Sequence, residues 1–405
     1  MGQPKHEART ILLTGSRAPV TLELARQFAR IGHRVLVADS LPYDLCASSR
    51  AVQQRFTVPT PRHNTTAFIA ALRHIIQTEQ VDWLIPTCEE VFYISAGRDW
   101  LTPYCQVFVE PLAKLKPLHN KWLFIQKIQA LGLAVPQTWQ VASRAALIAI
   151  LASNIPERLV IKPVYSRFAT QVRFLEKSAS VLPSIDLSPA NPWVLQAFIP
   201  GTHYCLYGIA HDGKLTAFAA YPTLFTAGQG ACIYFKAIDA PHLLSWMQTI
   251  VAAEQFTGQI AFDVIETEDG TIYPLECNPR AISAVHLFEP SDRLDQAFFG
   301  SIDSLIRPVA DRQVAVRFAM VLYGLPHAVM TGRLGQWVQA MGRARGAILQ
   351  WRDPLPGLFL PRMLGRLAYQ SLQQRQSLQT VSTQDIEWDG TAIRIEGEIE
   401  ERQAR

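Results

Sequence analysis

The first hundred residues alternate between apolar runs and amphipathic helical patterns. Residues 10–14 and 34–38 are apolar runs, and the segment 20–32 between them repeats apolar residues with the period of a helix. Another apolar run follows at 81–85. Strands that alternate with helices in this way build βαβ units, whose strands are parallel. The start of the chain is therefore predicted to be an α/β domain around a parallel sheet.

The middle of the chain has shorter apolar runs, several of them joined by tight turns, which is typical of hairpins. Strands are expected at 159–163, 171–175, 193–199, 202–210, 215–221 and 231–237. Helices are expected at 121–130, 143–152 and 243–256. After residue 290 the pattern is mostly helical, with one strand predicted at 314–322. The predicted fold class is thus a combination of α/β and α+β parts.

A predicted β-hairpin over residues 260–280 carries the most informative polar pattern. Two apolar runs flank an acidic turn that closes on an Asp-Gly pair. Glu276 and Asn278 alternate on the second strand and share a face, and a suitable register brings Asp263 of the first strand to the same face. Two carboxylates and an amide oxygen form a set of hard ligands that suits Mg²⁺. The alternative is an ordinary hairpin with a solvated polar face.

Three basic residues are candidates to meet an anion near this hairpin. Arg280 follows it directly, Lys162 ends the predicted strand 159–163, and Lys121 begins the predicted helix 121–130. A lysine in a buried strand needs an anionic partner, because burying an unpaired charge is costly. The fork of donors of an arginine suits a phosphate. Each lysine also has a plainer interpretation, as a solvated strand end or as an ordinary residue on a helix surface.

Two turns at the edge of the predicted parallel sheet carry further polar candidates. The first turn contains Gly15 in place of the G-x-G-x-x-G pattern, which disfavours a nicotinamide or flavin site. Arg17 in that turn lies beside a predicted helix N-terminus and is either an anion ligand or a solvated loop residue. Glu89 and Glu90 follow the strand at 81–85. They either face a substrate amine or hydroxyl, or favour the dipole of the next helix.

Composition argues against several kinds of protein, including nucleic-acid-binding, disulfide-rich and membrane-spanning ones. The net charge of +4 and the 18% of charged residues give no sign of a nucleic-acid-binding tail. The six cysteines are scattered without a CxxC pair, which argues against a zinc site and a disulfide framework and favours a reducing cytoplasm. The polar N-terminus does not resemble a signal peptide, and no apolar run is long enough to predict a membrane span.

Four segments, taken in order, resemble the ATP-grasp superfamily of carboxylate–amine ligases. They are Asn120-Lys121, the strand at 159–163, the run at 194–201, and the hairpin that ends in Glu-x-Asn-Pro-Arg at 276–280. The resemblance covers roughly residues 10–300, and the last motif is the most specific. It implies a Rossmann-like domain at 1–112, a small ATP-grasp lobe with a hinge at 113–200, a large lobe with the metal hairpin at 201–300, and a C-terminal extension at 301–405.

The resemblance also implies roles for single residues. Lys121 and Lys162 would contact the phosphates of ATP, and Arg280 would contact the transferred phosphate or an acyl-phosphate. The Mg²⁺ ligands would be Asp263, Glu276 and Asn278. The backbone that reads adenine would belong to Gln196, Ala197, Phe198 and Ile199.

Two departures from the family pattern accompany these roles. His203 takes a place where the family usually has a glutamate that holds the ribose hydroxyls. The loop 165–170 stands where the family has a glycine-rich flap over the phosphates, and here it contains no glycine. Glycine makes such a flap easy to move. In this loop the charge of Arg167 is expected to compensate for the absence of glycine.

The activity that the resemblance implies is ATP- and Mg²⁺-dependent ligation. A small-molecule carboxylate, or alternatively an enol acid, is activated as a phosphate intermediate and condensed with an amine, with release of ADP and phosphate. The residues expected to line the substrate pocket are Arg17, Glu89, Glu90, Ser283 and His286. The C-terminal third is similar to ATP-grasp enzymes of secondary metabolism, such as the mycosporine-glycine synthase type. A homodimer is frequent in the superfamily. The alternative hypothesis is a nucleotide-binding regulatory or partner protein with a degenerate site.

Overall fold

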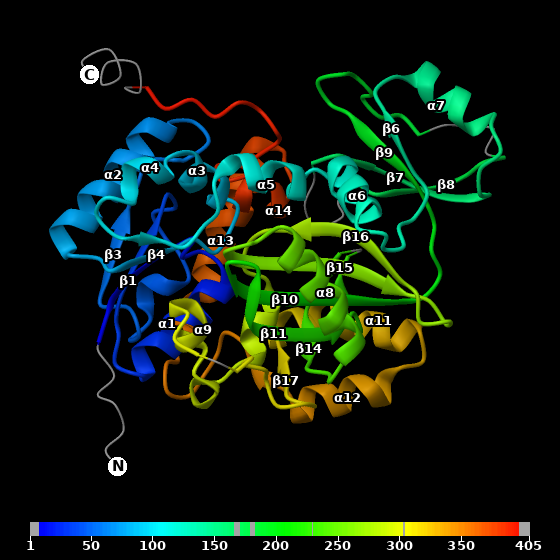
Figure 1. The fold of residues 1–405 in the computed structure, drawn as a ribbon. Coiled ribbons are helices and arrows are strands. Elements are labelled where there is room, and N and C mark those ends of the chain that lie inside the picture. The colour runs from blue at the N-terminus through cyan, green and yellow to red at the C-terminus, as the bar shows by residue number, and fades with distance from the viewer. Residues whose placement is uncertain (1–7, 166–170, 179–182, 229, 303, 397–405) are drawn as a thin grey trace.

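The N-terminal part of the computed structural model is a five-stranded parallel sheet with the order β3-β2-β1-β4-β5 (Figure 1). Its strands are β1 (Thr10–Thr14), β2 (Arg34–Asp39), β3 (Gln54–Thr57), β4 (Trp83–Ile85) and β5 (Gln106–Val107). Its helices are α1 (Pro19–Arg30), α2 (Thr65–Glu79), α3 (Val91–Ala96) and α4 (Arg98–Leu101). The predicted parallel α/β domain is therefore confirmed. The structure describes residues 8–165, 171–178, 183–228, 230–302 and 304–396.

A smaller antiparallel sheet with the order β6-β9-β7-β8 follows, and in Figure 1 it stands apart at the upper right. Its strands are β6 (Thr138–Val141), β7 (Arg158–Pro163), β8 (Arg173–Glu176) and β9 (Trp193–Ala197). The helices before and within it are α5 (Leu112–His119), α6 (Lys121–Ala130) and α7 (Arg144–Leu151). Asn120 caps α6, because its side chain accepts a hydrogen bond from the Leu123 amide at 3.0 Å. Apart from Tyr165, the predicted flap at 165–170 lies outside the described residues.

The largest antiparallel sheet has the order β11-β10-β15-β16 and contains the predicted hairpin. Its strands are β10 (Thr202–His211), β11 (Lys214–Pro222), β15 (Gly258–Glu266) and β16 (Ile272–Asn278), and α8 (Pro241–Ala253) packs on it. Gly270 closes the hairpin turn with a φ of 82°, a conformation that favours glycine. A short hairpin of β12 (Thr226–Ala227) and β13 (Ala231–Cys232) is attached to this part.

The C-terminal part contains a further small sheet and a group of helices. The sheet is formed by β14 (Tyr234–Lys236), β17 (Gln313–Ala315) and β18 (Arg345–Gly346). The helices are α9 (Leu294–Phe299), α10 (Arg317–Ala319), α11 (Leu325–Met330), α12 (Leu334–Arg343), α13 (Leu355–Gln374) and α14 (Leu378–Thr383). No helix among the described residues is long and apolar enough to cross a membrane.

Two strand predictions in this region were wrong in extent. The strand predicted at 314–322 ends at Ala315, and a helical segment begins at Arg317. The strand stops because β14 offers a partner over three residues, and the apolar side chains beyond it, such as Phe318, point outward from a helix. The strand predicted at 231–237 divides at Ile233 into β13 and β14, which belong to different sheets.

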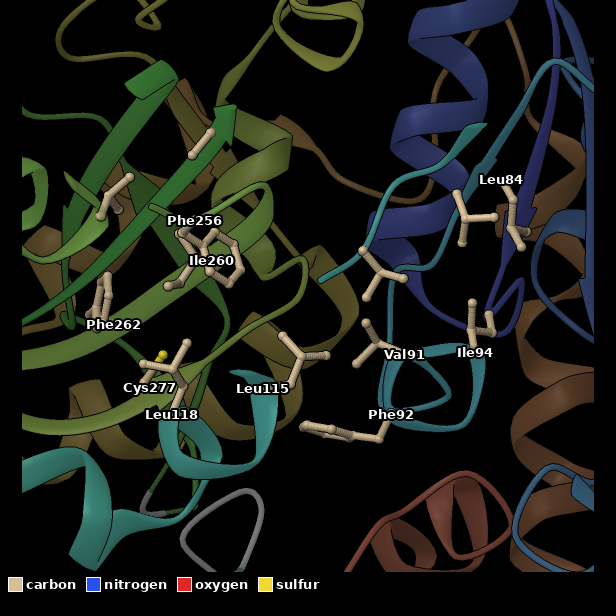
Figure 2. Close-up of a cluster of buried hydrophobic side chains, with 14 of the residues drawn as sticks. Leu84, Val91, Phe92, Ile94, Leu115, Leu118, Phe256, Ile260, Phe262 and Cys277 are labelled. Atoms are coloured by element: carbon tan, nitrogen blue, oxygen red, sulfur yellow. The ribbon is translucent and has the colours of Figure 1, made fainter. Parts of the chain in front are cut away.

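One hydrophobic cluster joins the N-terminal part to the back of the hairpin sheet (Figure 2). Leu84 and Phe92 reach it from the N-terminal part, and Phe262 and Cys277 reach it from the hairpin. Because side chains alternate along a strand, burying Phe262 and Cys277 turns the neighbouring Asp263 and Glu276 away from this core. Packing of the apolar face thus fixes which polar side chains the hairpin presents on its other face.

Candidate functional site

A β-bulge brings the three predicted metal ligands to one face of the hairpin. Asp263 pairs with Glu276 while Val264 pairs with Pro274, so Leu275 is an extra residue on β16. In an unbroken register Asp263 would lie opposite Leu275, and Glu276 would point to the other face of the sheet. The bulge therefore aligns the two carboxylates. The sequence predicted their convergence, but it contained no sign of the bulge that produces it.

The side chains of the hairpin set contact one another directly. Nδ2 of Asn278 donates to Glu276 Oε1 at 3.2 Å and to Asp263 Oδ2 at 3.4 Å. Its amide oxygen accepts a hydrogen bond from Nη2 of Arg280 at 3.0 Å. Asp263 and Glu276 keep 22% and 29% of their side chains exposed, so the oxygen set opens to solvent. A half-turn of the Asn278 amide would add its oxygen to that set.

Both predicted lysines lie beside this oxygen set. Nζ of Lys121 is 3.2 Å from Glu276 Oε2. Nζ of Lys162 donates to the carbonyl oxygen of the bulge residue Leu275 at 3.2 Å. The bulge thus aligns the carboxylates and also holds a lysine that comes from the smaller sheet. The solvated interpretation of both lysines is excluded, because both residues are buried.

Burial and the cluster of charges shift the pKa values at this site. Burial, followed by the charge of Lys121, lowers the pKa of Lys162 to about 8 against the opposing effects of Glu276 and Asp263. Burial alone would raise the pKa of Glu276, but the two lysines hold it well below its usual range. The site therefore keeps an ionised carboxylate beside two crowded cations. An additional group with several negative charges would relieve the repulsion between them.

The two predicted glutamates after β4 have different surroundings. Glu89 is fully buried, with Oε1 at 3.6 Å from Arg280 Nη2, so it belongs to the same cluster. Glu90 instead accepts hydrogen bonds at Oε1 from the hydroxyl of Thr14 at 2.7 Å and from the amide of Thr87 at 3.1 Å. This carboxylate therefore ties the ends of β1 and β4 together, and a contact between Glu90 and a substrate stays a prediction.

Arg17 is also placed differently from its predicted role. Its guanidinium is buried and forms ion pairs with Asp39 at 2.5 Å and with Asp385 at 2.6 Å. Burial alone would lower the pKa of Arg17, but the two carboxylates raise it. A guanidinium held on both sides in this way has little capacity left for a substrate. We therefore correct its role to a link between the N-terminal sheet and the C-terminal segment.

Replacing Arg17 by methionine tests this link. The change leaves Asp39 and Asp385 buried without their cation, and we expect the free energy of unfolding to fall by about 3 kcal/mol. Denaturant unfolding followed by fluorescence measures the loss, and adding Asp385→Asn should recover part of it. Unchanged stability together with a raised KM for an acid would instead return Arg17 to the substrate pocket.

The remaining substrate candidates follow the hairpin. His286 is buried, with Nδ1 at 3.3 Å from Glu23 Oε2, and Arg345 approaches the same oxygen at 3.2 Å. His286 thus belongs to a buried ion-pair group, and its substrate role is corrected on that ground. Ser283 begins a short 3₁₀ helix that runs to Leu287 and is partly exposed. Its contact with a substrate stays a prediction.

The predicted adenine-reading segment connects the smaller sheet to the larger one. Gln196 and Ala197 end β9, and Phe198 and Ile199 lead toward β10. The amides of Ala197 and Phe198 donate to carbonyl oxygens within the chain at 2.8 and 2.9 Å. The position between the two sheets agrees with the predicted role, which stays a prediction. His203, at the predicted ribose position, lies with Nε2 at 3.6 Å from Asp263 Oδ1.

The C-terminal segment supplies residues that the sequence did not assign to the site. Trp388 is buried, its amide donates to Glu89 Oε2 at 3.4 Å, and its ring packs edge-on against Tyr165. The hydroxyl of Tyr165 accepts a hydrogen bond from Asn120 at 3.0 Å, beside Lys121. Acidic and aromatic residues stand out in the sequence at 385–388, but their partners lie hundreds of residues away. No local pattern reveals such contacts.

Comparison with known protein families identifies the central region. The sequence profile of the ATP-grasp domain matches residues 118–284, which include both lysines and the whole hairpin. Residues 118–284 form an ATP-grasp domain. The predicted superfamily is thereby confirmed, and the predicted class of enzyme, an ATP-grasp ligase, agrees with it. A search of the curated protein sequences found no match.

Solved structures share this fold at low sequence identity. L-amino acid ligase from Bacillus licheniformis has a TM-score of 0.57 and 15% identity, over 76% of this chain and 79% of that one. The ADP complex of N5-carboxyaminoimidazole ribonucleotide synthetase gives 0.59 and 17%, over 76% and 80%. The N5-carboxyaminoimidazole synthetase from Staphylococcus aureus complexed with ADP gives 0.62 and 12%, over 76% and 82%. At these identities the similarity establishes the fold.

Proposed function

We propose that the protein is an ATP- and Mg²⁺-dependent ligase that joins an acid to an amine and releases ADP and phosphate. The observation that carries the proposal is that Lys121 and Lys162 lie directly beside the oxygen set of the hairpin. The two lysines come from α6 and β7, and the oxygen set comes from the larger sheet. ATP-grasp neighbours named as ligases and synthetases give the proposal further support.

The chemistry of the donor set fits a hard divalent cation. Asp263 and Glu276 offer carboxylate oxygens that open to solvent, and Asn278 can add an amide oxygen. Mg²⁺ held there would neutralise phosphate charge when ATP binds.

The proposed reaction needs positioning and charge compensation rather than a protein nucleophile. Lys121 and Lys162 hold the phosphates of ATP in line with the acid. A carboxylate oxygen of the acid attacks the γ-phosphorus, and ADP leaves. The amine nitrogen then attacks the acyl carbon, loses a proton, and expels inorganic phosphate that carries the acid's oxygen. Arg280, positioned by Glu89, faces the charge that builds on the transferred phosphate.

The domain division, oligomeric state and compartment that we propose follow the sequence predictions. We keep the four-part division of the chain and the possible homodimer as proposals. None of the six cysteines forms a disulfide, which supports a reducing compartment such as the cytoplasm. A mycosporine-type substrate stays a hypothesis from the resemblance alone.

Release of ADP from purified protein with Mg²⁺ tests the function. We expect release to require both an acid and an amine, and a panel of acid–amine pairs, beginning with amino acids, should reveal the pairs that support it. ATP hydrolysis that is independent of both added substrates would contradict the proposed ligation.

A second function, nucleotide binding without turnover, rests on His203 at the predicted ribose position, where the family usually has a glutamate. In that case ATP would raise the unfolding temperature while no acid–amine pair released ADP.

A further inference from the structure

Two potential ligand atoms of a different character lie on the strand next to Asp263 of the oxygen set. His203 and Cys205 are two residues apart on β10 and therefore share a face of the sheet. Cys205 pairs in register with Asp263 of β15. The thiol of Cys205 donates to Asp263 Oδ1 at 3.0 Å, and Nε2 of His203 lies 3.6 Å from the same oxygen. All three ligand atoms lie within 4.8 Å of one another. The sheet register therefore presents an imidazole, a thiol and a carboxylate to one point.

We propose that His203, Cys205 and Asp263 form a Zn²⁺ site whose occupation excludes Mg²⁺–ATP from the nucleotide site. The site stands on its own geometry, whereas the exclusion rests on the proposed function.

The ligand set distinguishes zinc from magnesium. Zinc accepts sulfur, nitrogen and oxygen ligands at about 2.0–2.3 Å, and a tetrahedral ion at these distances separates its ligand atoms by roughly 3–4 Å. The separations of 3.0 and 3.6 Å to Asp263 Oδ1 already lie close to that range. Magnesium prefers oxygen ligands and an octahedron. Three protein ligands leave the fourth position of the zinc ion to water, as in an open site.

Nε2 of His203 is available to coordinate a metal ion. Nε2 is shielded from solvent and, within the described part of the chain, has no hydrogen-bond partner. A buried polar atom without a partner costs free energy. Coordination would satisfy Nε2 and would replace the thiol proton of Cys205, which leaves to solvent, while zinc keeps its charge of +2 throughout. About a third of the His203 side chain is exposed, which gives the ion a route inward.

Sharing of Asp263 makes zinc and the magnesium nucleotide compete. Oδ1 of Asp263 committed to zinc is withdrawn from the hard oxygen set, and the charge of the zinc ion repels a second divalent cation held through Oδ2 and Glu276. His203 would also be turned away from the predicted ribose position. Zinc bound here therefore inhibits ATP binding. The sequence analysis argued against zinc because the cysteines lack CxxC spacing, but the third ligand lies 58 residues after Cys205, where spacing rules do not reach.

Cys205→Ser tests the site, because a serine hydroxyl still donates to Asp263 but provides no thiolate. Metal-free protein is titrated with Co²⁺, which gives a thiolate charge-transfer band in absorption, and with Zn²⁺ against a chromophoric chelator. We expect one equivalent of each metal to bind the unaltered protein. Cys205→Ser should lose the band and bind zinc at least about 100-fold more weakly. Equal unfolding temperatures of the two metal-free proteins will show that the variant folds.

Cys232→Ser is the matched control, since the Cys232 thiol is directed to the carbonyl oxygen of Tyr234 instead. It should keep the band and the zinc affinity. A band that is absent from the unaltered protein, or that disappears with Cys232→Ser and not with Cys205→Ser, overturns the site.

The competition is measured by titrating ATP, with Mg²⁺ present, into protein with and without one equivalent of zinc. We expect zinc to weaken ATP binding at least tenfold in the unaltered protein and to have no effect on Cys205→Ser. Zinc that binds through Cys205 without changing the ATP affinity overturns the exclusion. Protein that binds zinc but no ATP in its absence contradicts the proposed function and leaves the zinc site standing.

Discussion

Replacing Glu276 by glutamine will lower the rate of ADP release on the order of 10³-fold. The side chain keeps its shape and loses the charge that stands between Lys121 and the other hairpin ligands. Two effects add in the same direction: a neutral amide is a weaker ligand for Mg²⁺, and the lysines lose the anion that orients them. A coupled assay of ADP release, with any acid–amine pair found active, measures the loss.

The matched control for this change is Glu268→Gln, which removes the same charge from the exposed turn of the same hairpin. It should leave the rate unchanged within a factor of two. Circular dichroism of both variants separates chemistry from folding. A Glu276→Gln protein that keeps a tenth or more of the activity would show that the hairpin is not the metal site, and the assignment of Asp263 and Asn278 would fall with it.

Much of the site was predictable because its residues are set by local rules. Asn120 caps α6, and the helix begins at Lys121 as the sequence predicted. The alternation of apolar and polar residues placed Glu276 and Asn278 on one face of their strand. Lys162 was recognisable because a lysine at the end of a buried strand needs an anionic partner.

The failures share a different cause, which is dependence on distant partners. The bulge at Leu275 has no signature in its own sequence, yet it decides whether Glu276 shares the face of Asp263. The strand predicted beyond Ala315 became a helix because its neighbours in the sheet end there. Arg17 and His286 looked like pocket residues, but carboxylates from elsewhere in the chain hold them. Such outcomes follow from tertiary packing, which overrides local preference.

The C-terminal segment shows how far such long-range contacts extend. Asp385 pairs with Arg17 at the edge of the N-terminal sheet, and the Trp388 amide contacts Glu89. Glu89 in turn contacts Arg280 at the end of the hairpin. The extension that the sequence left without a role therefore supports the arginine proposed to meet the transferred phosphate. We infer that shortening the chain before residue 385 would loosen Arg280 rather than simply trim a tail.

Lys162→Met should give the second large effect, a weaker affinity for ATP. Loss of this cation removes a proposed phosphate contact, and we expect the dissociation constant of Mg²⁺–ATP to rise by about 30-fold or more. Isothermal titration measures it. Lys177→Met, which removes a lysine outside the site, should leave the constant unchanged.

The same Lys162→Met variant should be more stable than the native protein when no ligand is bound. The pKa of Lys162 falls from 10.5 to about 8 in the folded state, so below pH 8 folding forces a charge into a place that disfavours it. Between about pH 8 and 10.5 the unfolded chain holds a proton that the folded chain has lost, and native stability therefore rises with pH in that window. Methionine removes both the free-energy cost of burying the charge and this dependence of stability on pH, and it loses one hydrogen bond to Leu275. We expect a gain of about 2 kcal/mol at pH 7 in denaturant unfolding. A variant that is less stable at pH 7, or whose stability still rises with pH, would show that the neighbouring carboxylates already balance the charge of Lys162 when no ligand is bound. A more stable variant with poor affinity for ATP would show that the charge of Lys162 serves phosphate binding at a cost in stability.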